Sequence, residues 1–203
     1  MPTAEVDIAN RALQAVGGKG RITALDAAQA AVSREAAVCY EHFDNCRDST
    51  LADADWPFAR HRVDLSALSE DTQEDWVYVY AYPDNCLRVR KVVAPDTSTP
   101  VPYEVSLNAA GTARVILCDT EDAIAVYTRL IEDPNLWSPW FDAALGYRLA
   151  MAIALPLAGT TATDILKTVQ QAYLYALSRA LSGVRQEGRA REPAEAASIT
   201  ARY

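Results

Sequence analysis

The sequence lacks an uninterrupted run of about 18 apolar residues, so we expect no segment that spans a membrane. Its 203 residues include only four cysteines, too few for a disulfide framework, and we expect all four to be reduced and buried. Glu5 and Asp7 stand near the start, where a secretory leader needs basic residues before an apolar segment. We therefore expect a protein that is made and used without Sec-type secretion.

Sequence signatures of catalysis are also missing. There are only two histidines, and the chain contains no Gly-x-Ser-x-Gly, no zinc-protease helix and no dinucleotide fingerprint. Carboxylates are plentiful, but no pair is marked by its spacing as a general acid and base, and a catalytic site needs converging groups. The sequence therefore predicts that the protein is not an enzyme and binds no cofactor.

Cys39, His42 and Cys46 are the best candidates for metal ligands, because they share one face of a predicted helix. Zinc prefers Cys and His, but a structural zinc site needs four ligands. The residues that could complete such a site are His61, Cys86 and Cys118. Two core cysteines beside a surface histidine are the simpler interpretation, so we predict no metal site. A small metal-binding regulator or enzyme is the least favoured alternative.

Positive charge is scarce. The net charge is −8 and the pI is near 4.8, which argues against a protein that grips nucleic acid through its phosphates. An acidic surface could still face DNA whose passage must not be slowed by binding.

Helical patterns occupy both ends of the chain. The longest runs from Asp26, a predicted N-cap, to Phe58, with Pro57 marking its end. Others are expected over 4–16, 139–155 and 163–185, and Pro156 marks the end of the helix over 139–155. Apolar periodicity predicts that one core is formed by Val32, Ala36, Cys39, Phe43, Leu145, Leu149, Val169, Tyr173 and Leu177.

The sequence between these helices has the pattern of short β-strands. Five strands are predicted, over 76–80, 87–92, 101–107, 113–118 and 123–130, with antiparallel pairing because the links are short. Asn108 to Gly111 is predicted to connect two of them as a hairpin. His61 is assigned to a surface turn.

We therefore predict an α+β fold, in which a bundle of about four helices (1–59 and 131–186) is interrupted by a small antiparallel β domain (60–130). Residues 187–203 have mixed charges and no periodicity, so they cannot bury enough apolar surface to offset their ordering entropy. We expect them to form an extended arm that becomes ordered on a partner.

Several segments resemble phage tail tubular protein A, the head-to-tail adaptor family of short-tailed phages and their relatives. The likeness covers about residues 3–185. It is carried by Thr3–Leu13 with Gly17 and Ile22–Asp26, by Trp56–Arg60, by Tyr82–Val89, and by Val126–Arg129 with Asp133-Pro134 and Trp137–Phe141. Tyr82 departs from the family, which usually has Leu at that position.

The resemblance implies a virion structural protein. Such adaptors form a ring, normally of twelve copies, beneath the portal protein, and carry the tail nozzle or later tail proteins. DNA passes through the ring without sequence-specific binding, so the expected location is the neck of a virion assembled in the host cytoplasm. The helical part would form the ring and meet the portal, while the β part would point toward the tail. The resemblance implies neither a catalytic residue nor a membrane.

The family resemblance also implies that the C-terminal arm docks on the portal. The residues expected to do so are Arg185, Arg189, Arg191, Ile199, Arg202 and Tyr203. An adaptor or head-completion protein of a long-tailed phage or gene-transfer particle remains an alternative, since related folds serve there too.

Overall fold

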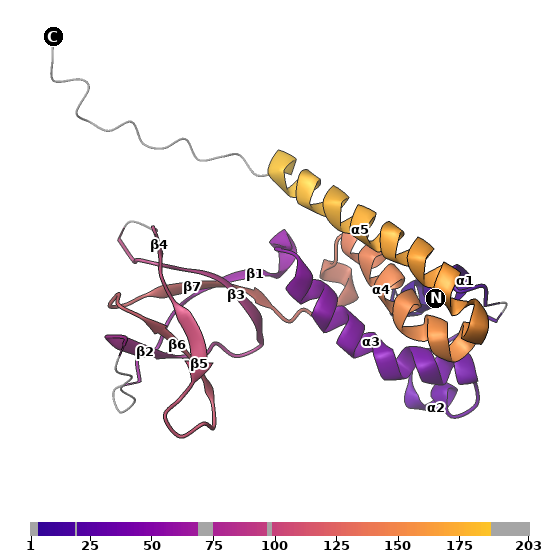
Figure 1. Ribbon diagram of the computed structural model, residues 1–203, viewed down its shortest axis with the longest axis horizontal. Coiled ribbons are helices and arrows are strands. Elements are labelled where there is room, and N and C mark those ends of the chain that lie inside the picture. The colour runs from indigo at the N-terminus through magenta and orange to yellow at the C-terminus, as the bar shows by residue number, and fades with distance from the viewer. Residues whose placement is uncertain (1–3, 19, 69–74, 97–98, 188–203) are drawn as a thin grey trace, which may run out of the picture.

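The computed structural model describes residues 4–18, 20–68, 75–96 and 99–187 (Figure 1). The chain has a mixed α+β fold, as predicted, with helices gathered at one end and strands at the other. The helices are α1 (Ala4–Ala15), the single turn α2 (Ala27–Ala30), α3 (Arg34–Asp53), α4 (Pro139–Ala158) and α5 (Ala162–Glu187). Short 3₁₀ turns cover Pro57–Ala59, Pro134–Leu136 and Gly159–Thr161.

The long helix predicted from Asp26 to Phe58 is two helices. Asp26 does act as an N-cap, its Oδ1 accepting from Gln29 N at 2.8 Å, but α2 ends after one turn. Ser33 then takes an extended conformation, and its Oγ accepts from Ala36 N at 3.3 Å to begin α3. A second local cap thus competes with helix continuation.

This break explains why one predicted core residue is wrong. Val32 lies between the two helices with 81% of its surface exposed, although its spacing placed it on the apolar stripe. The predicted stripe assumed one continuous helix. The turn at Ser33 interrupts the helical periodicity, so Val32 no longer shares a face with the apolar residues of α3. The C-terminus of α3 also comes earlier than predicted, at Asp53, because Ala54 is extended.

Pro156 does not end α4, contrary to the prediction. The helix continues to Ala158, and Gly159 then adopts φ +54° and donates its N–H to Leu155 O. A proline in the last turn removes only one intrahelical hydrogen bond. Arg34, at the start of α3, donates to Pro156 O at 2.6 Å and so holds this turn against the neighbouring helix.

The helical core is built from the facing sides of α1, α3, α4 and α5 (Figure 1). Seven of the nine residues assigned to it from the sequence are buried there, and Leu177 is half-buried against the same cluster. The buried seven are Ala36, Cys39, Phe43, Leu145, Leu149, Val169 and Tyr173.

The stretch Pro139–Ser182 is long and apolar enough, by length and composition alone, to cross a membrane, although it contains no uninterrupted apolar run of that length. The core helix of a soluble protein passes the same test, and Phe141, Leu145 and Leu149 of α4 are buried against the other helices.

The strands form two antiparallel sheets that share a core. The first has the order β1-β7-β3-β4 and the second β2-β6-β5. Their bounds are Arg60–Asp64 (β1), Tyr78–Ala81 (β2), Cys86–Val93 (β3), Pro100–Val101 (β4), Glu104–Leu107 (β5), Arg114–Cys118 (β6) and Ile124–Arg129 (β7). Residues from both sheets, including Tyr80, Val92, Ile116 and Tyr127, meet in the space between them.

Two strand assignments differ from the sequence prediction. The segment 101–107 is interrupted after Val101, so that β4 and β5 belong to different sheets. His61 lies in β1, an edge strand paired with β7, rather than in a turn. Strand β1 is almost wholly exposed, so it lacks the apolar alternation that identifies a half-buried strand. The predicted hairpin is present, with Asn108 Oδ1 accepting from Thr112 N at 2.7 Å.

Candidate functional site

An aromatic cluster joins the end of α3 to the start of α4. Phe141 contacts Trp56, Phe58 and Trp137, with ring centroids 5.2, 5.3 and 5.2 Å away. The indole N–H of Trp56 donates to Thr50 O, and that of Trp137 donates to Ile131 O. Both polar groups are therefore satisfied inside the protein, and the cluster is a structural core rather than a platform for a ligand.

Arg90 of β3 fastens the first sheet to the C-terminus of α3. Its Nη2 donates to the carbonyl oxygens of Leu51, Ala52 and Ala54, and its Nε donates to Thr128 Oγ1 at 2.8 Å. The last carbonyls of a helix have no partner within it and carry partial negative charge, so a cation is favoured there. Burial and the neighbouring Arg88 lower the pKa of Arg90.

Three of the four segments that carry the family resemblance meet at this junction. Trp56–Phe58 and Trp137–Phe141 supply the aromatic cluster, and Leu87, from the third segment, is half-buried against the same helical core. Leu130 and Ile131, which follow β7, pack there too. Parts of the chain about 80 residues apart in sequence thus form a single joint between the helices and the first sheet.

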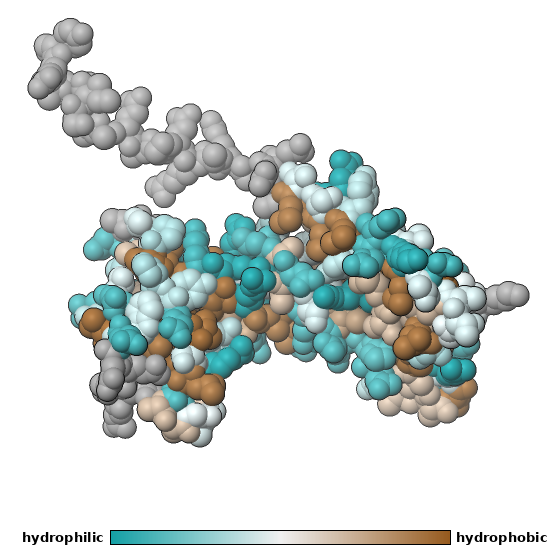
Figure 2. Space-filling view, in the orientation of Figure 1, coloured by the Kyte–Doolittle hydropathy of each residue, from teal (hydrophilic) through white to brown (hydrophobic). Residues whose placement is uncertain are grey.

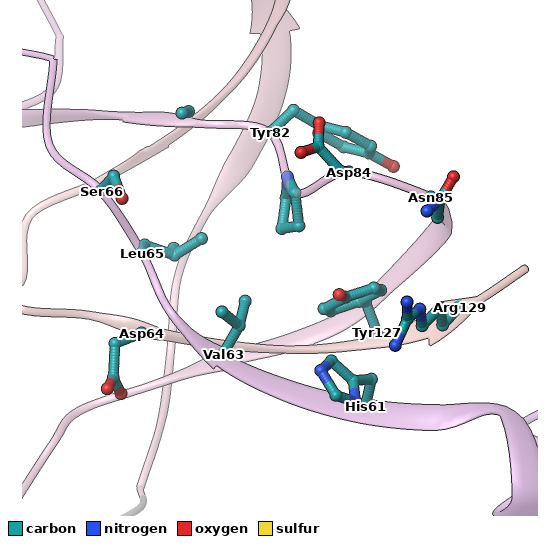
Figure 3. Close-up of a pocket in the computed structure, with 12 residues that line it drawn as sticks. His61, Val63, Asp64, Leu65, Ser66, Tyr82, Asp84, Asn85, Tyr127 and Arg129 are labelled. Carbon is teal, nitrogen blue, oxygen red and sulfur yellow. The ribbon is translucent and has the colours of Figure 1, made fainter.

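A recess of about 400 Å³ lies beside the junction, between β1, β7 and the turn after β2. Figure 3 shows His61 and Arg129 near Tyr127 on one side of the recess, with Tyr82 and Asp84 on the other. His61 meets the Tyr127 ring edge-on at 5.5 Å. This ring contact positions His61 at the edge of the recess.

The cysteines lie where the simpler interpretation put them. All four are free and buried, Cys39 and Cys46 in the helical core and Cys86 and Cys118 between the sheets. Burial, with a smaller effect of Glu35, raises the pKa of Cys39 to about 12, and burial raises that of Cys46 to about 11. Thiolate is the metal-binding form, so these environments disfavour a metal. Among the described residues no group of three metal-ligating side chains comes together.

The outer face of the first sheet carries a basic groove of about 510 Å³, lined by Arg60, Arg62, Arg90 and Lys91 together with Asp55, Val93 and Val126. Alternation along β1 puts Arg60 and Arg62 on one face of the sheet. Arg62 and Lys91 both pair with Val126 of β7, one from each side, so they form a row across three strands. The strand β1 was not predicted from the sequence, so this row was not foreseen.

The helix hairpin α4–α5 exposes apolar and aromatic side chains. Trp140, Leu174, Tyr175 and Leu181 are between 42% and 61% exposed. The Arg179 guanidinium lies over both Trp140 and Tyr175, 5.7 and 5.9 Å from the ring centroids. Figure 2 shows apolar surface interrupting the hydrophilic one along α5.

The predicted portal-docking residues fall at the limit of the structure. Arg185 belongs to α5 by its backbone, and its side chain is not described. The rest of the predicted arm, Arg189, Arg191, Ile199, Arg202 and Tyr203, lies outside the described residues.

No protein-family model matches the chain, and no curated protein sequence matches it either. The resemblance to the tail adaptor family therefore stays a prediction, carried by the sequence segments that meet at the junction.

Proposed function

We propose that this chain is a structural adaptor of a phage particle, placed between the portal protein and the tail, with no catalytic activity of its own. In this proposal several copies, normally twelve in the family it resembles, close into a ring in the neck of the virion. The ring binds the portal on one side and the tail nozzle or another tail protein on the other. DNA leaves the head through its channel without being bound by sequence.

The observation that carries the proposal is the convergence of three of the four resembling segments on one joint. Trp56, Phe58, Trp137 and Phe141 pack together, and Leu87 reaches the same core. The segments that resemble the adaptor family thus hold the helical part and the first sheet together. This arrangement suits a protein that acts by shape.

The proposal includes the finer domain layout. We infer that residues 1–59 and 131–186 act as one helical unit that forms the ring, with 60–130 inserted as a β domain directed toward the tail. The helices share one apolar cluster and the two sheets share another, which favours this division. The arm at 187–203 would dock on the portal.

Surface chemistry gives further support. The exposed aromatic side chains of α4 and α5 suit protein contacts, since Trp, Tyr and Arg dominate the energetics of interfaces. The buried cysteines with raised pKa values disfavour the alternative of a metal-binding regulator built on Cys39, His42 and Cys46.

The test is particle mass in solution, alone and mixed with the portal protein encoded in the same genome. A ring-sized species, formed alone or only on the portal, is the expected result. A chain that stays monomeric and also fails to bind the portal would contradict the proposal. If the chain binds the portal protein of a long-tailed phage and not that of a short-tailed phage, the result would favour the alternative of an adaptor in a long-tailed particle.

A further inference from the structure

Helix α4 is apolar on nearly every side, although part of it lies at the surface. Its 20 residues include two charged side chains, those of Asp142 and Arg148, and it packs against α1, α3 and α5. A helix of this composition is normally covered all round, since a surface helix needs a polar face. Trp140, Ala143 and Tyr147 share the remaining side of α4 by their spacing, and Trp140 is 42% exposed. Among the described residues, this side of α4 is therefore left partly uncovered.

A groove of about 400 Å³ lies beside this side of α4, between α1 and α4, and we call it the α1–α4 groove. Arg11 and Gln14 line it from α1, and Asp142, Ala143 and Tyr147 line it from α4. The Oδ1 atom of Asp142 is buried and has no hydrogen-bond partner within the described part of the chain. Burial raises the pKa of Asp142, while the nearby Arg11 opposes that shift. The groove thus offers one cationic donor and one buried carboxyl oxygen that lacks a partner.

Helix α5 carries a second apolar surface. Leu174 and Leu181 lie two turns apart on one side of this helix and are 57% and 48% exposed. Gln170, one turn before Leu174, is exposed on the same side. We call Gln170, Leu174 and Leu181 the α5 ridge. Arg179, which lies over Trp140, is roughly 140–180° away around the helix. The α5 ridge and the Trp140 side of α4 therefore lie on opposite flanks of α5.

We propose that the α1–α4 groove receives the α5 ridge of a second copy of this chain, so that copies join head to tail. This inference rests on the proposed ring and names the surfaces that would build it. Two different surfaces on opposite flanks make the contact heterologous, and a heterologous contact closes into a ring when its rotation permits. Leu174 and Leu181, seven residues apart, have the spacing of the anchors with which an amphipathic helix docks in a groove.

The side chain of Gln170 suits the groove because an amide is both a donor and an acceptor. Its N–H group would donate to Asp142 Oδ1, and its carbonyl oxygen would accept from the Arg11 guanidinium, whose Nε donates to Asp7 O. A carboxylate would be attracted by Arg11 but repelled by Asp142, and a cation would meet the reverse conflict. A neutral amide meets neither, so this pair of charges selects an uncharged polar group.

The charge of the chain also favours an uncharged contact. Each copy carries a net charge of −8, so two copies repel one another at long range. The α1–α4 groove is lined by one charge of each sign and the α5 ridge by none, so their contact adds no further repulsion. Trp140 and Tyr147 add the aromatic surface that is enriched at the centre of protein interfaces.

Two variants of the full-length chain test the contact. The groove variant, Gln14→Trp, fills the groove from an exposed position, and the ridge variant, Leu174→Ser with Leu181→Ser, removes the ridge. The matched controls are Asn45→Trp on α3 and Leu155→Ser on α4, both at exposed positions outside the two surfaces. Circular dichroism and thermal unfolding establish that each variant is folded. Sedimentation velocity then measures self-association at about 50 and about 500 mM NaCl, alone and with the portal.

We expect wild type and both controls to associate, and to do so more strongly at high salt, because salt screens the repulsion between acidic copies and leaves an apolar contact intact. The groove variant and the ridge variant should each associate at least about tenfold more weakly. An equimolar mixture of the two should form dimers and nothing larger, because each pair retains one intact groove and one intact ridge that can meet. Dimers in the mixture alone are the specific signature of a heterologous contact.

The variant Asp142→Leu separates binding from folding. It removes a buried oxygen that has no partner, so the midpoint of thermal unfolding should rise or should fall by no more than about 2 °C. Association should nevertheless weaken at least about tenfold, because Gln170 of the second copy loses its acceptor. A steep fall of the midpoint with unchanged association would assign Asp142 to the fold and contradict its role in the contact.

Association of the groove or ridge variant at the wild-type level would overturn the inference, as would a mixture of the folded variants that stays monomeric. A wild-type chain that does not self-associate at either salt concentration, with or without portal, would also overturn it. Loss of portal binding in the groove variant, with unchanged self-association, would assign the groove to the portal instead. Rings on the portal that survive both variants leave the adaptor proposal standing, whereas failure of wild type to bind portal contradicts both proposals.

Discussion

The Tyr173 hydroxyl donates a hydrogen bond to Asp53 Oδ2 across 2.6 Å, tying the middle of α5 to the last residue of α3. Arg148 Nη1 of α4 reaches the same oxygen at 3.0 Å. One carboxylate oxygen thus links three helices at the end of the bundle nearest the sheets. Burial and the bond to Asp53 both raise the pKa of Tyr173, so the phenol stays a neutral donor.

Removing that hydroxyl tests the link. Tyr173→Phe should lower the free energy of unfolding by about 1–2 kcal/mol, because a hydrogen bond to a charged group is lost while the ring is kept. Tyr175→Phe is the matched control, since Tyr175 is 61% exposed, and it should change stability by less than about 0.5 kcal/mol. Equal effects in urea titrations of the two variants would contradict the role of Asp53.

The apolar stripe of α3 predicts a second contrast. Phe43 is 3% exposed in the helical core, and Phe43→Ala should cost about 3–5 kcal/mol through lost burial and the cavity left behind. Val32→Ala, at the exposed break between α2 and α3, should cost less than about 0.5 kcal/mol. A substantial loss at Val32 beside the large loss at Phe43 would mean that the unbroken helix predicted from the sequence is the correct description.

Arg90 should contribute more to the stability of the fold than its exposed neighbour, Arg88. Arg90→Met should lower the free energy of unfolding by about 2–3 kcal/mol, because it removes the donor that the carbonyls of Leu51, Ala52 and Ala54 share. Arg88 makes one hydrogen bond, 3.3 Å to Ala52 O, and Arg88→Met should cost less than about 1 kcal/mol. Chemical denaturation of both variants measures the difference, and a cost at Arg90 no larger than that at Arg88 would refute the anchoring role.

Stability should fall in alkaline solution because of the buried thiols. The pKa of Cys39 is raised to about 12 in the folded chain, against about 8.5 for a free thiol. Between those values the unfolded state releases a proton that the folded state keeps, so unfolding becomes easier as pH rises. From pH 9 to 11 this should remove about 2 kcal/mol.

The pH effect is measured by urea unfolding at several pH values. Cys39→Ala should show a shallower loss of stability than wild type over this interval. Thr50→Val, a buried substitution on the same helix that does not titrate, serves as control and should shift stability equally at every pH. Parallel pH profiles for Cys39→Ala and wild type would count against the assignment.

Deletion of 189–203 tests the arm that composition predicts. The free energy of unfolding should change by less than about 0.5 kcal/mol, because a segment without apolar periodicity contributes little to a core. Affinity for the portal should fall. A chain with residues 189–203 in scrambled order is the control for length and charge, and full portal binding by the truncated chain would exclude a docking arm.

Local chemistry made part of this structure predictable. Asp26 caps a helix, α2, and Asn108 closes the β5–β6 hairpin, both as expected. Each of these features depends on groups only a few residues apart, so the sequence contains the whole cause. The α+β class followed in the same way from the change of period between helical and strand segments.

Features that depend on distant parts of the chain were missed or wrong. The passage of α4 through Pro156 and the edge strand β1 each involve contacts with remote segments, whereas the exposure of Val32 follows from the local cap at Ser33. Arg34, for example, meets Pro156 O from 122 positions away.

The sequence by itself therefore determined where α2 and α4 begin and where the β5–β6 turn lies, which residues are apolar enough for a core, and the absence of a recognisable catalytic motif. Only the tertiary structure decided that Arg90 caps α3, that Asp53 joins three helices, and that Arg62 and Lys91 flank Val126 as one row. Burial and charge clustering are properties of three-dimensional neighbourhoods. Neither can be computed from spacing along the chain until the elements have packed.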